Sequence, residues 1–586
     1  MHNMKMIRKM MFLLLPAQIL LAVVGTINNL VSTYFASNYV GVDALSAVGL
    51  YSPLNMFLNA TGTLLSGGCA IICGKLLGQN DHKKLQGVFS LDLIVASIIG
   101  LLFALVLGSA AALNQTSFFT KDPVVRNLFN QFLLGQVIGM VPTLLSAQLP
   151  VFLAMENQNK RTFIASLVYI FFNLIFNVTF VLFMKMGIFG VALSSSLGMW
   201  IFIFVAGEYF VSKKSELKYV FHSIPWQQIT NIISIGFPGA ASFLYQTVRG
   251  LIVNRLLEAR IGSVGLSAFA GANNIMGLFW AIPSGMVAVS RLLMGISIGE
   301  EDRRSLIDVM KGAMWYYVPL MALIDVGIIL CANPLTYLLF KDTSSQVFTM
   351  AANGLRILPL CMPFSVMYLH FVCYGQSIDR KVYINVLALL DGVICVVVFS
   401  YLLIHSMGIN GVYVANVLNG VITTIYIIAY AWIKLKRMPK SIEDLMVIPK
   451  EFGAPEENRI DISLNTMEEV VHLAEKIQAF CKEKGIDERR AYLAALAMEE
   501  MAGNIVSHGF TKDHKKHTID VRVVYKDEDV IMRIKDDCIP FDPKERKDLT
   551  ENEDITKNIG IRMVYRIAKK IDYQNLLGLN VLQIRI

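Results

Sequence analysis

The stretch LLGQNDHKKL (Leu76–Leu85) has a second copy further along the chain, SIGEEDRRSL (Ser297–Leu306), and the two align without a gap at a shift of 221 positions. The same shift aligns longer blocks and a pair of prolines: Gly41–Leu85 with Gly262–Leu306, MGIFGV (Met186–Val191) with MGINGV (Met407–Val412), and Pro142 with Pro363. Unrelated segments rarely keep one register over so many residues. The sequence therefore indicates an internal duplication, a common construction of membrane transporters.

The composition indicates that the duplicated part lies in a membrane. Of the 586 residues, 55% are hydrophobic and only 16% are charged, whereas a soluble globular protein carries about 25% charged residues. A helix needs about 20 mostly apolar residues to span a bilayer, and we count twelve such stretches between Met11 and Trp432. We therefore predict an all-α polytopic membrane protein with twelve transmembrane helices in two six-helix repeats, residues 1–220 and 221–437.

The beginning of the chain has some features of a signal peptide. Lys5, Arg8 and Lys9 precede an apolar run that starts at Met11, and basic residues before an apolar segment are typical of such peptides. The run continues past Leu30 without a small-residue cleavage site. We therefore expect a first transmembrane helix that is retained.

The net charge of +8 is distributed in a way that favours a membrane orientation over a nucleic-acid-binding face. Lysine and arginine gather in alternate loops and after the last apolar stretch: Lys83 and Lys84, Lys160 and Arg161, Lys213 and Lys214, Arg303 and Arg304, Arg380 and Lys381, and Lys434–Lys440. Loops rich in lysine and arginine stay in the cytoplasm. The pattern predicts a multi-pass protein of the cell membrane with both termini cytoplasmic, the lipid bilayer as a partner and no nucleic acid.

The chain changes character after the last apolar stretch. Residues 438–458 are polar, contain three prolines and are predicted to form a linker. Residues 459–586 are typical of a soluble α/β domain, because alternating apolar segments at 459–464, 518–525, 530–536 and 580–586 predict strands, while 466–483, 488–507 and 559–570 predict helices. We expect this cytoplasmic α/β sandwich to touch the two repeats at the loops containing Asp81 and Asp302.

The membrane half resembles a known family. NNLVSTYFASNYVGVDALSAVGLYSPL (Asn28–Leu54), the LLGQND that follows, and GFPGAASFLYQ (Gly236–Gln246) are similar to segments of multidrug and toxic compound extrusion (MATE) transporters. The resemblance covers roughly residues 7–436. It implies two helical lobes around a central cavity, and secondary active efflux, by antiport, of small organic, often cationic, compounds driven by a Na⁺ or H⁺ gradient.

Two positions depart from the family pattern in the first repeat. Ser32 stands where many members have an aspartate, and Asn177 stands where one branch has an aspartate one turn after the asparagine at Asn173. A hydroxyl and an amide can hydrogen-bond a ligand or coordinate sodium, but they cannot carry a proton at physiological pH. Of the ionisable residues left in the apolar helices, Asp325 and Asp391 lie deepest in their stretches. We take all five residues as transport candidates.

Residues of the C-terminal domain suggest a nucleotide site. Glu500 and Asn504 are four residues apart in a predicted helix, so that a carboxylate and an amide could hold hydrated Mg²⁺ beside a phosphate. IKDDCIPFDP (Ile534–Pro543) ends a predicted strand, and KNIGIRMVY (Lys557–Tyr565) places Gly560 at a helix start, where backbone N–H groups can receive phosphate.

This series of segments resembles histidine-kinase-like ATPase domains of the anti-sigma-factor type. The resemblance implies Mg-ATP as cofactor, Glu500 as catalytic base and Asn504 as magnesium ligand. The nucleotide contacts that it implies are Asn504, Asp536, Cys538, Pro540, Asn558 and Gly560. Cys538 replaces a glycine of the family pattern DxGxPFDP, and Asn558 replaces the first glycine of its pattern GxGL.

Three hypotheses fit this organisation. The first is an efflux transporter whose C-terminal domain binds ATP or a protein partner and regulates transport. The second is a membrane-anchored signalling protein, with the C-terminal domain as a serine kinase or anti-sigma-like binder and the membrane half as a sensor. A primary ATP-driven pump is the least favoured, because the usual pump motifs are absent. The eight cysteines show no metal-binding spacing.

Overall fold

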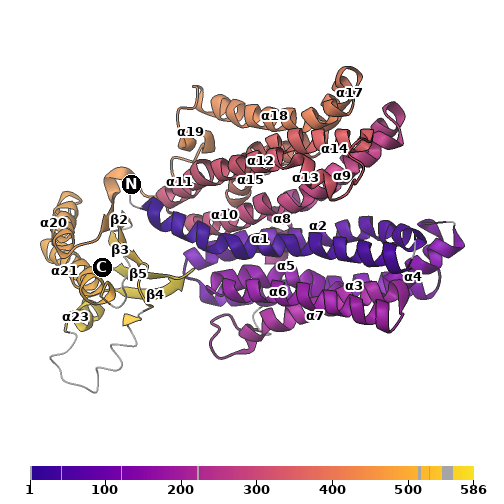
Figure 1. The fold of residues 1–586 in the computed structure, drawn as a ribbon. Coiled ribbons are helices and arrows are strands. Elements are labelled where there is room, and N and C mark those ends of the chain that lie inside the picture. The colour runs from indigo at the N-terminus through magenta and orange to yellow at the C-terminus, as the bar shows by residue number, and fades with distance from the viewer. Residues whose placement is uncertain are drawn as a thin grey trace.

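The computed structural model describes residues 3–40, 42–120, 122–220, 224–511, 517–526, 528–540, 542–543 and 559–586. Two parts are evident in Figure 1: a large body of long helices and a smaller domain at one end that contains all the labelled strands. Both ends of the chain lie at that end of the molecule. We call the end of the helical half that contacts the smaller domain the domain-facing end.

The helical half is built from two lobes. The first lobe contains α1 (Asn3–Phe35), α2 (Val42–Gly78), α3 (His82–Ala112), α4 (Pro123–Val137), α5 (Met140–Met155), α6 (Asn159–Asn177) and α7 (Gly187–Val211). The second contains α8 (Gln228–Arg260), α9 (Ser263–Phe279), α10 (Ala281–Gly299), α11 (Arg303–Gly312), α12 (Val318–Leu330), α13 (Ala332–Tyr337), α14 (Gln346–Ile357), α15 (Met362–Ser377), α16 (Lys381–Leu389), α17 (Cys395–Met407) and α18 (Ile409–Leu435). Short π and 3₁₀ turns join several of these helices into longer rods: η1 (Ala36–Val40), η2 (Thr116–Phe118), η3 (Val178–Phe183), η4 (Ala313–Tyr317), η5 (Leu358–Cys361) and η6 (Leu390–Ile394).

The expected twelve spans correspond to these rods. Within the described residues, ten helices are long and apolar enough to cross a membrane, and the pair α4 and α5, bent by 46°, makes up to eleven. The remaining rod is α8, which has 33 residues but carries polar side chains such as Gln246, Arg249 and Asn254 that lower its hydropathy. The helical membrane architecture is confirmed, and the difference in count is due to α8.

The duplicated loops fold in the same way in both repeats. Asp81 caps α3 by accepting a hydrogen bond from the Lys84 amide, and Asp302 caps α11 by accepting one from the Ser305 amide. The residue before each aspartate is left-handed, with φ of 58° at Asn80 and 50° at Glu301. Aspartate at this position satisfies an amide that the helix leaves unpaired. The paired aspartates therefore have a structural role in both copies.

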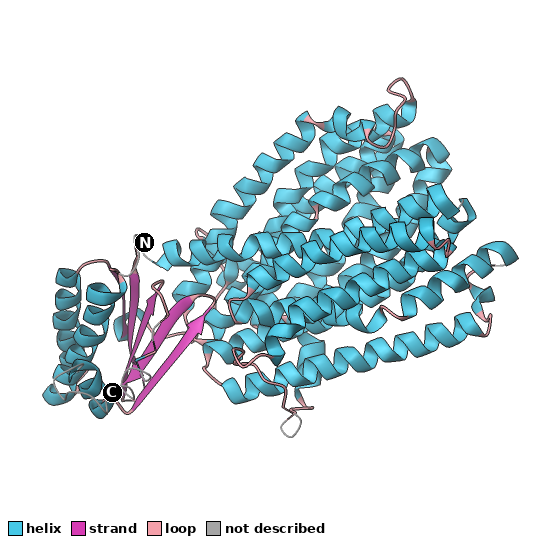
Figure 2. Ribbon diagram, turned by 60° about the horizontal axis from the view of Figure 1, so that its bottom comes forward, coloured by secondary structure: helices cyan, strands magenta, loops and turns pink. Residues whose placement is uncertain are grey.

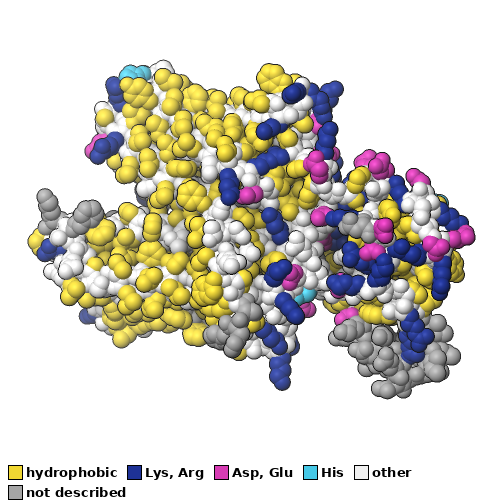
Figure 3. Space-filling model, turned by 180° about the vertical axis from the view of Figure 1, so that it is seen from behind, with side chains coloured by type: hydrophobic (Ala, Val, Ile, Leu, Met, Phe, Trp, Pro, Cys, Tyr) yellow, Lys and Arg dark blue, Asp and Glu magenta, His cyan; other side chains and the backbone are white. Residues whose placement is uncertain are grey.

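The two lobes touch at the domain-facing end through glycines that are copies of each other. A Cβ on Gly74 would lie 3.2 Å from the backbone of Gly295, and one on Gly78 or Gly299 would collide with the backbone of the opposite helix. Such close approach of α2 and α10 is open only to residues without a side chain. At the far end the lobes spread apart (Figure 1), and a hollow separates them there in Figure 3.

The C-terminal domain is a five-stranded antiparallel sheet with helices on one face. Its elements are β1 (Arg459–Leu464), α20 (Met467–Glu483), α21 (Glu488–Asn504), η8 (Ile505–Gly509), β2 (Ile519–Lys526), β3 (Asp529–Asp536), α23 (Ile559–Ile567), β4 (Lys570–Leu576) and β5 (Leu579–Arg585), in the sheet order β1-β2-β3-β5-β4. The helices cover the face away from the membrane half (Figure 2). The predicted α/β class is confirmed, but strand β4 was not predicted, and the helix expected to reach Lys570 ends at Ile567.

The predicted linker is packed against the second lobe. Its short helix α19 (Ile442–Met446) is capped by Ser441, and Arg380 donates hydrogen bonds to the carbonyls of Met446 and Val447. Arg303 forms a 2.8 Å ion pair with Glu443. The segment therefore fixes the start of the C-terminal domain to the second lobe.

Candidate functional sites

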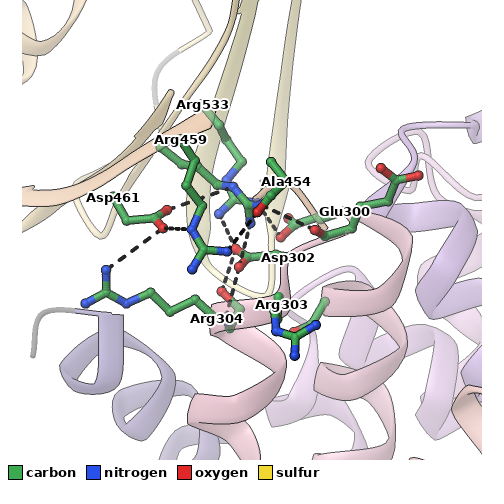
Figure 4. Close-up of polar contacts among 12 residues, drawn as sticks. Glu300, Asp302, Arg303, Arg304, Ala454, Arg459, Asp461 and Arg533 are labelled. Carbon is green, nitrogen blue, oxygen red and sulfur yellow. Dashed lines mark hydrogen bonds and ion pairs between the residues drawn. The ribbon is translucent and has the colours of Figure 1, made fainter. Parts of the chain in front are cut away.

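The sheet of the C-terminal domain meets the second lobe through basic side chains. Because side chains alternate along a strand, Val521, Val523, Met532 and Ile534 enter the domain core while Arg522, Arg533 and Lys535 face the helical half. Arg533 forms ion pairs of 2.7 Å with Glu300 and 2.5 Å with Asp302. Figure 4 shows Glu300 and Asp302 directed from the turn before α11 toward Arg533.

The register of the sheet explains why these contacts matter. Arg522 and Arg533 are directly opposite each other on β2 and β3, and like charges in that arrangement destabilise a sheet. The carboxylate of Asp302 lies within 2.6 Å of Arg522 and 2.5 Å of Arg533, and its side chain is 1% exposed. Burial alone would raise the pKa of Asp302, but the charges of Arg533, Arg522 and Lys535 hold it well below its usual range. The domain surface is thus complementary to this turn.

The first lobe makes fewer contacts with the same domain. Lys9 of α1 forms a 2.5 Å ion pair with Asp537, which follows β3. The side chain of Asn157, between α5 and α6, lies 2.9 Å from the position of a Cβ on Gly578, in the β4–β5 turn. Gln79, from the first copy of the duplicated loop, lines a hollow that it shares with Glu301 and Arg522. Both lobes therefore contact the C-terminal domain, but the buried ion pairs belong to the second.

A cavity of about 310 Å³ lies between the first lobe and α10. Its walls combine apolar side chains with hydroxyl and amide groups: Leu14, Gln18, Leu21, Val24, Asn59, Ser66, Thr143, Ser146, Met199, Phe202, Ser284 and Arg291 are among them. Binding sites for small molecules are typically apolar clefts of this size with a few polar groups. Arg291 was not among the residues singled out from the sequence.

The neutral residues predicted in the first lobe form one polar cluster. Ser32 Oγ lies 3.4 Å from Ser195 Oγ, and Asn177 donates to the carbonyl of Asn173 at 2.9 Å. Asn28, which was not predicted, accepts hydrogen bonds from Asn173 and Ser195 at 3.2 and 2.8 Å. Asn177 Oδ1 is buried without a hydrogen-bond partner in the described part of the chain. The cluster offers uncharged oxygens on α1, α6 and α7.

The two predicted aspartates of the second lobe differ in their surroundings. Asp391 accepts hydrogen bonds from Tyr368 at 2.5 Å and from Asn419 at 2.7 Å. Asp325 is 3% exposed, and neither of its oxygens has a hydrogen-bond partner among the described residues. A carboxylate buried at membrane depth is costly unless it is protonated or binds a cation. Asp325 is therefore the more unusual of the two.

Three of the predicted nucleotide residues line a pocket of about 410 Å³ in the C-terminal domain. Asn504 lines it together with Asp536 and Cys538. Asp536 Oδ1 accepts hydrogen bonds from the Asn580 side chain at 2.8 Å and from the Cys538 amide at 3.0 Å. Burial raises the pKa of Asp536, and these hydrogen bonds oppose the shift. Asn580, which was not predicted, thus positions the carboxylate expected to recognise adenine.

The other predicted nucleotide residues lie at the edge of the pocket or outside it. Glu500 contacts Gly560, where a Cβ would collide with the carboxylate, so the predicted base and the start of α23 are adjacent. Pro540 is exposed and is not among the residues that line the pocket. Asn558 lies outside the described residues.

Three candidate metal-binding side chains lie together beside this pocket. One ligand atom each from His517, Asp537 and Cys538 lies within 4.8 Å of the others, and His517 Nδ1 is 3.0 Å from Asp537 Oδ1. An imidazole, a carboxylate and a thiol are ligands that zinc accepts. The sequence could not reveal the group, because the pairing of β2 with β3 brings the three residues together.

The fold and sites together define a two-lobed helical membrane protein with a central cavity and an appended α/β domain that contains a pocket. The family model MatE matches residues 17–179 and 238–402, so the chain belongs to the MATE family, as the resemblance implied. The model of the histidine kinase-like ATPase domain matches residues 464–586. The chain therefore carries such a domain after its MATE half.

Individual relatives agree with this assignment. The chain is 24% identical over 346 residues to a probable multidrug resistance protein NorM from Listeria innocua, covering 57% of this chain and 72% of the relative. A NorM protein of Listeria monocytogenes is also 24% identical, over 329 residues, with 54% of this chain and 69% of that protein covered.

Solved structures show the same fold for the helical half. An outward-facing multidrug resistance MATE family transporter of the MOP superfamily superimposes with a TM-score of 0.68 at 20% identity, covering 75% of this chain and 97% of that chain. A MATE transporter in its straight conformation gives the same values.

Proposed function

We propose that the protein is a secondary active transporter that exports small organic compounds, with its domain-facing end in the cytoplasm. The observation that carries the proposal is the 310 Å³ cavity between two lobes that touch at one end and part at the other. Duplicated halves that rock about a central site are the usual architecture of alternating access. The relatives named as multidrug resistance proteins support export of drug-like molecules. A cavity walled by both lobes favours transport over a sensor.

The basic side chains support the cytoplasmic orientation. Side chains of lysine and arginine gather beside the C-terminal domain in Figure 3, while most of the rest of the helical surface is apolar. Lys84, Arg303 and Arg380 lie at the starts of α3, α11 and α16, at this end. Loops rich in such residues remain on the cytoplasmic side.

We infer that Asp325 takes up the coupling cation, a proton or Na⁺. Its two oxygens lack hydrogen-bond partners among the residues that the structure describes, whereas Asp391 accepts hydrogen bonds from Tyr368 and Asn419. The cluster around Ser32 and Asn177 has no carboxylate that could carry a proton. Its uncharged oxygens suit Na⁺, so the first lobe contributes at most a sodium site.

Transport in proteoliposomes tests both statements. We expect export of a fluorescent substrate to depend on an imposed Na⁺ or H⁺ gradient and to fall at least tenfold in Asp325→Asn. Glu258→Gln, which changes an exposed carboxylate on α8, serves as the control and should transport normally. Gradient-driven transport that is unchanged in Asp325→Asn would refute the role of Asp325, and the absence of any gradient-driven transport would refute the function.

We propose that the C-terminal domain regulates transport by binding Mg-ATP. Asp536, at the end of β3, and Cys538, in the loop that follows, line the pocket, and Asp537 between them contacts Lys9 of α1. A nucleotide that reorders this loop would alter the contact with the first lobe. We expect ATP to change the transport rate of the native protein and to have a smaller effect in Lys9→Gln. An equal response of both proteins to ATP would exclude this route.

A further inference from the structure

The charge of the central cavity is unusual for an exporter of cations. Of the residues that line it, Arg291 is the one with an ionisable side chain, and no carboxylate lines the cavity in the described part of the chain. Arg291 lies on α10, the second-lobe helix that closes the cavity. The cavity therefore presents a fixed positive charge to whatever enters it.

Arg291 interacts with the thiol of Cys373, but no acidic side chain in the described part of the chain neutralises its charge. No ion pair joins it to an acid among the described residues, although many other arginines of the chain are paired, such as Arg533 with Glu300. Its Nε is buried without a hydrogen-bond acceptor. Gly67 of α2 lies beside the guanidinium, since a Cβ on it would be 3.5 Å from Nη1. The absence of a side chain at Gly67 leaves room beside the guanidinium.

A partly buried guanidinium such as that of Arg291 stays charged at physiological pH. An unpaired charge at membrane depth is costly, and such residues usually meet a substrate or an ion. The planar guanidinium donates paired hydrogen bonds to carboxylates, sulfonates and phosphates. An anionic group of a ligand would supply the counter-charge that the described residues do not provide.

The other walls of the cavity indicate what the rest of such a ligand would be like. Leu14, Leu21 and Phe202 provide apolar walls, and Asn59 and Ser284 provide hydrogen-bonding groups. A volume of about 310 Å³ admits a small organic molecule. We propose that the cavity binds amphiphilic organic anions, with the acidic group on Arg291 and an aromatic or aliphatic body against the apolar walls. This substrate class rests on the proposed transport function and replaces the cationic class expected from the family resemblance.

A matched pair of fluorescent probes tests the charge preference directly. We would measure binding of naphthalene-2-sulfonate and of 2-naphthyl-trimethylammonium to the full-length protein in detergent micelles, with empty micelles subtracted. The anion is expected to bind at least tenfold more tightly than the cation. In Arg291→Gln the affinity for the anion should fall at least tenfold while that for the cation stays the same or rises. A native protein that prefers the cation would overturn the proposal.

Two further variants separate charge from structure. Arg291→Lys keeps the charge without the paired donors, so it should retain part of the anion affinity. Arg255→Gln removes an exposed arginine of α8 and should bind both probes as the native protein does. If Arg291→Gln weakens both probes equally, or if Arg291→Lys behaves as Arg291→Gln, the arginine has a structural role and the proposal fails. Thermal unfolding of each variant, followed by tryptophan fluorescence, identifies variants that do not fold.

Transport of the same probes separates this inference from the proposed function. Export of the sulfonate from proteoliposomes, lost in Arg291→Gln, supports both. Binding of the sulfonate that depends on Arg291, without export, supports an anion site and refutes the transporter. Export of the ammonium probe alone supports the transporter and refutes the anion site.

Discussion

At the scale of single residues, the pocket of the C-terminal domain has one residue that favours binding of Mg-ATP and one that disfavours it. Asn504 lies at the end of α21 and directs an amide toward the pocket, where Mg²⁺ and phosphates would bind. Cys538 replaces a glycine of the family pattern and lines the same pocket as Asp536, so its side chain takes up room there. Asn504 favours nucleotide binding and Cys538 disfavours it, so the affinity for Mg-ATP depends on both residues.

Substitution of these two residues should move the affinity in opposite directions. Asn504→Ala removes the predicted magnesium ligand and should weaken binding of Mg-ATP to the full-length protein at least tenfold, by about 1.4 kcal/mol or more. Cys538→Gly restores the residue of the family pattern and should strengthen binding. Isothermal titration calorimetry measures both, with Cys481→Ser as a control because Cys481 lies in the core of the domain. Equal affinities in Asn504→Ala and the native protein would exclude the predicted magnesium site.

Some site residues could be predicted from the sequence, whereas the role of others depends on how the chain packs. Ser32, Asn173 and Asn177 were found because polar groups interrupt apolar helices, and the structure brings them together. Arg291 also interrupts an apolar stretch, but its importance depends on which face of α10 meets the cavity, and packing of the two lobes decides that. Asn580 was missed because the sheet register brings it to Asp536.

At the scale of secondary-structure elements, ion pairs connect the turn before α11 to strands β2 and β3. These ion pairs differ in how deeply they are buried. Arg533 and Glu300 are 12% and 5% exposed, whereas Lys526 and Glu301, also 2.7 Å apart, are 49% and 60% exposed. The duplication explains the position of the turn but not its role, since the equivalent Asp81 pairs with Lys84 of its own helix instead. The two copies also differ in sequence here, since Glu300 and Glu301 stand where the first copy has Gln79 and Asn80.

Removal of one partner from each pair should therefore have unequal effects. Arg533→Ala leaves Glu300 and Asp302 with less compensation and should weaken docking of the domain by about 3–5 kcal/mol, as is usual for a broken buried pair. Lys526→Ala removes an exposed pair and should cost less than about 1 kcal/mol. Distances between spin labels on α20 and in the α2–α3 turn report docking as denaturant is added. Equal losses in the two variants would show that the buried network does not hold the domain.

The same network sets the expected pH dependence of docking. The pKa of Asp302 is held well below its usual range, so its contribution is complete above its ordinary pKa of about 3.9 and is lost as the pH falls through the lowered value. Docking measured with the same spin labels should be constant between pH 8 and about pH 5 and should weaken only in stronger acid. Asp302→Asn should dock more weakly at neutral pH and lack the loss in acid that this carboxylate causes. Release of the native domain near neutral pH would contradict this assignment.

At the scale of the whole molecule, the C-terminal domain is attached to the two lobes in unequal ways. The linker and the network around Asp302 fix it to the second lobe. The first lobe meets it through Lys9 and through Asn157, which approaches the turn at Gly578. If the lobes part at their domain-facing ends during transport, the domain should move with the second lobe. The contacts with the first lobe would then have to break in each cycle.

Two engineered disulfides distinguish this motion from a static attachment. The pair Asn157→Cys and Gly578→Cys links the domain to the first lobe, whereas Glu301→Cys and Lys526→Cys links it to the second, both in a background with the exposed Cys331 replaced by serine. We expect oxidation of the first pair to stop transport in proteoliposomes and reduction to restore it. The second pair should transport equally when oxidised or reduced, because that contact does not change. Undiminished transport with the first disulfide formed would show that the lobes do not separate at this end, or that the domain does not follow the second lobe.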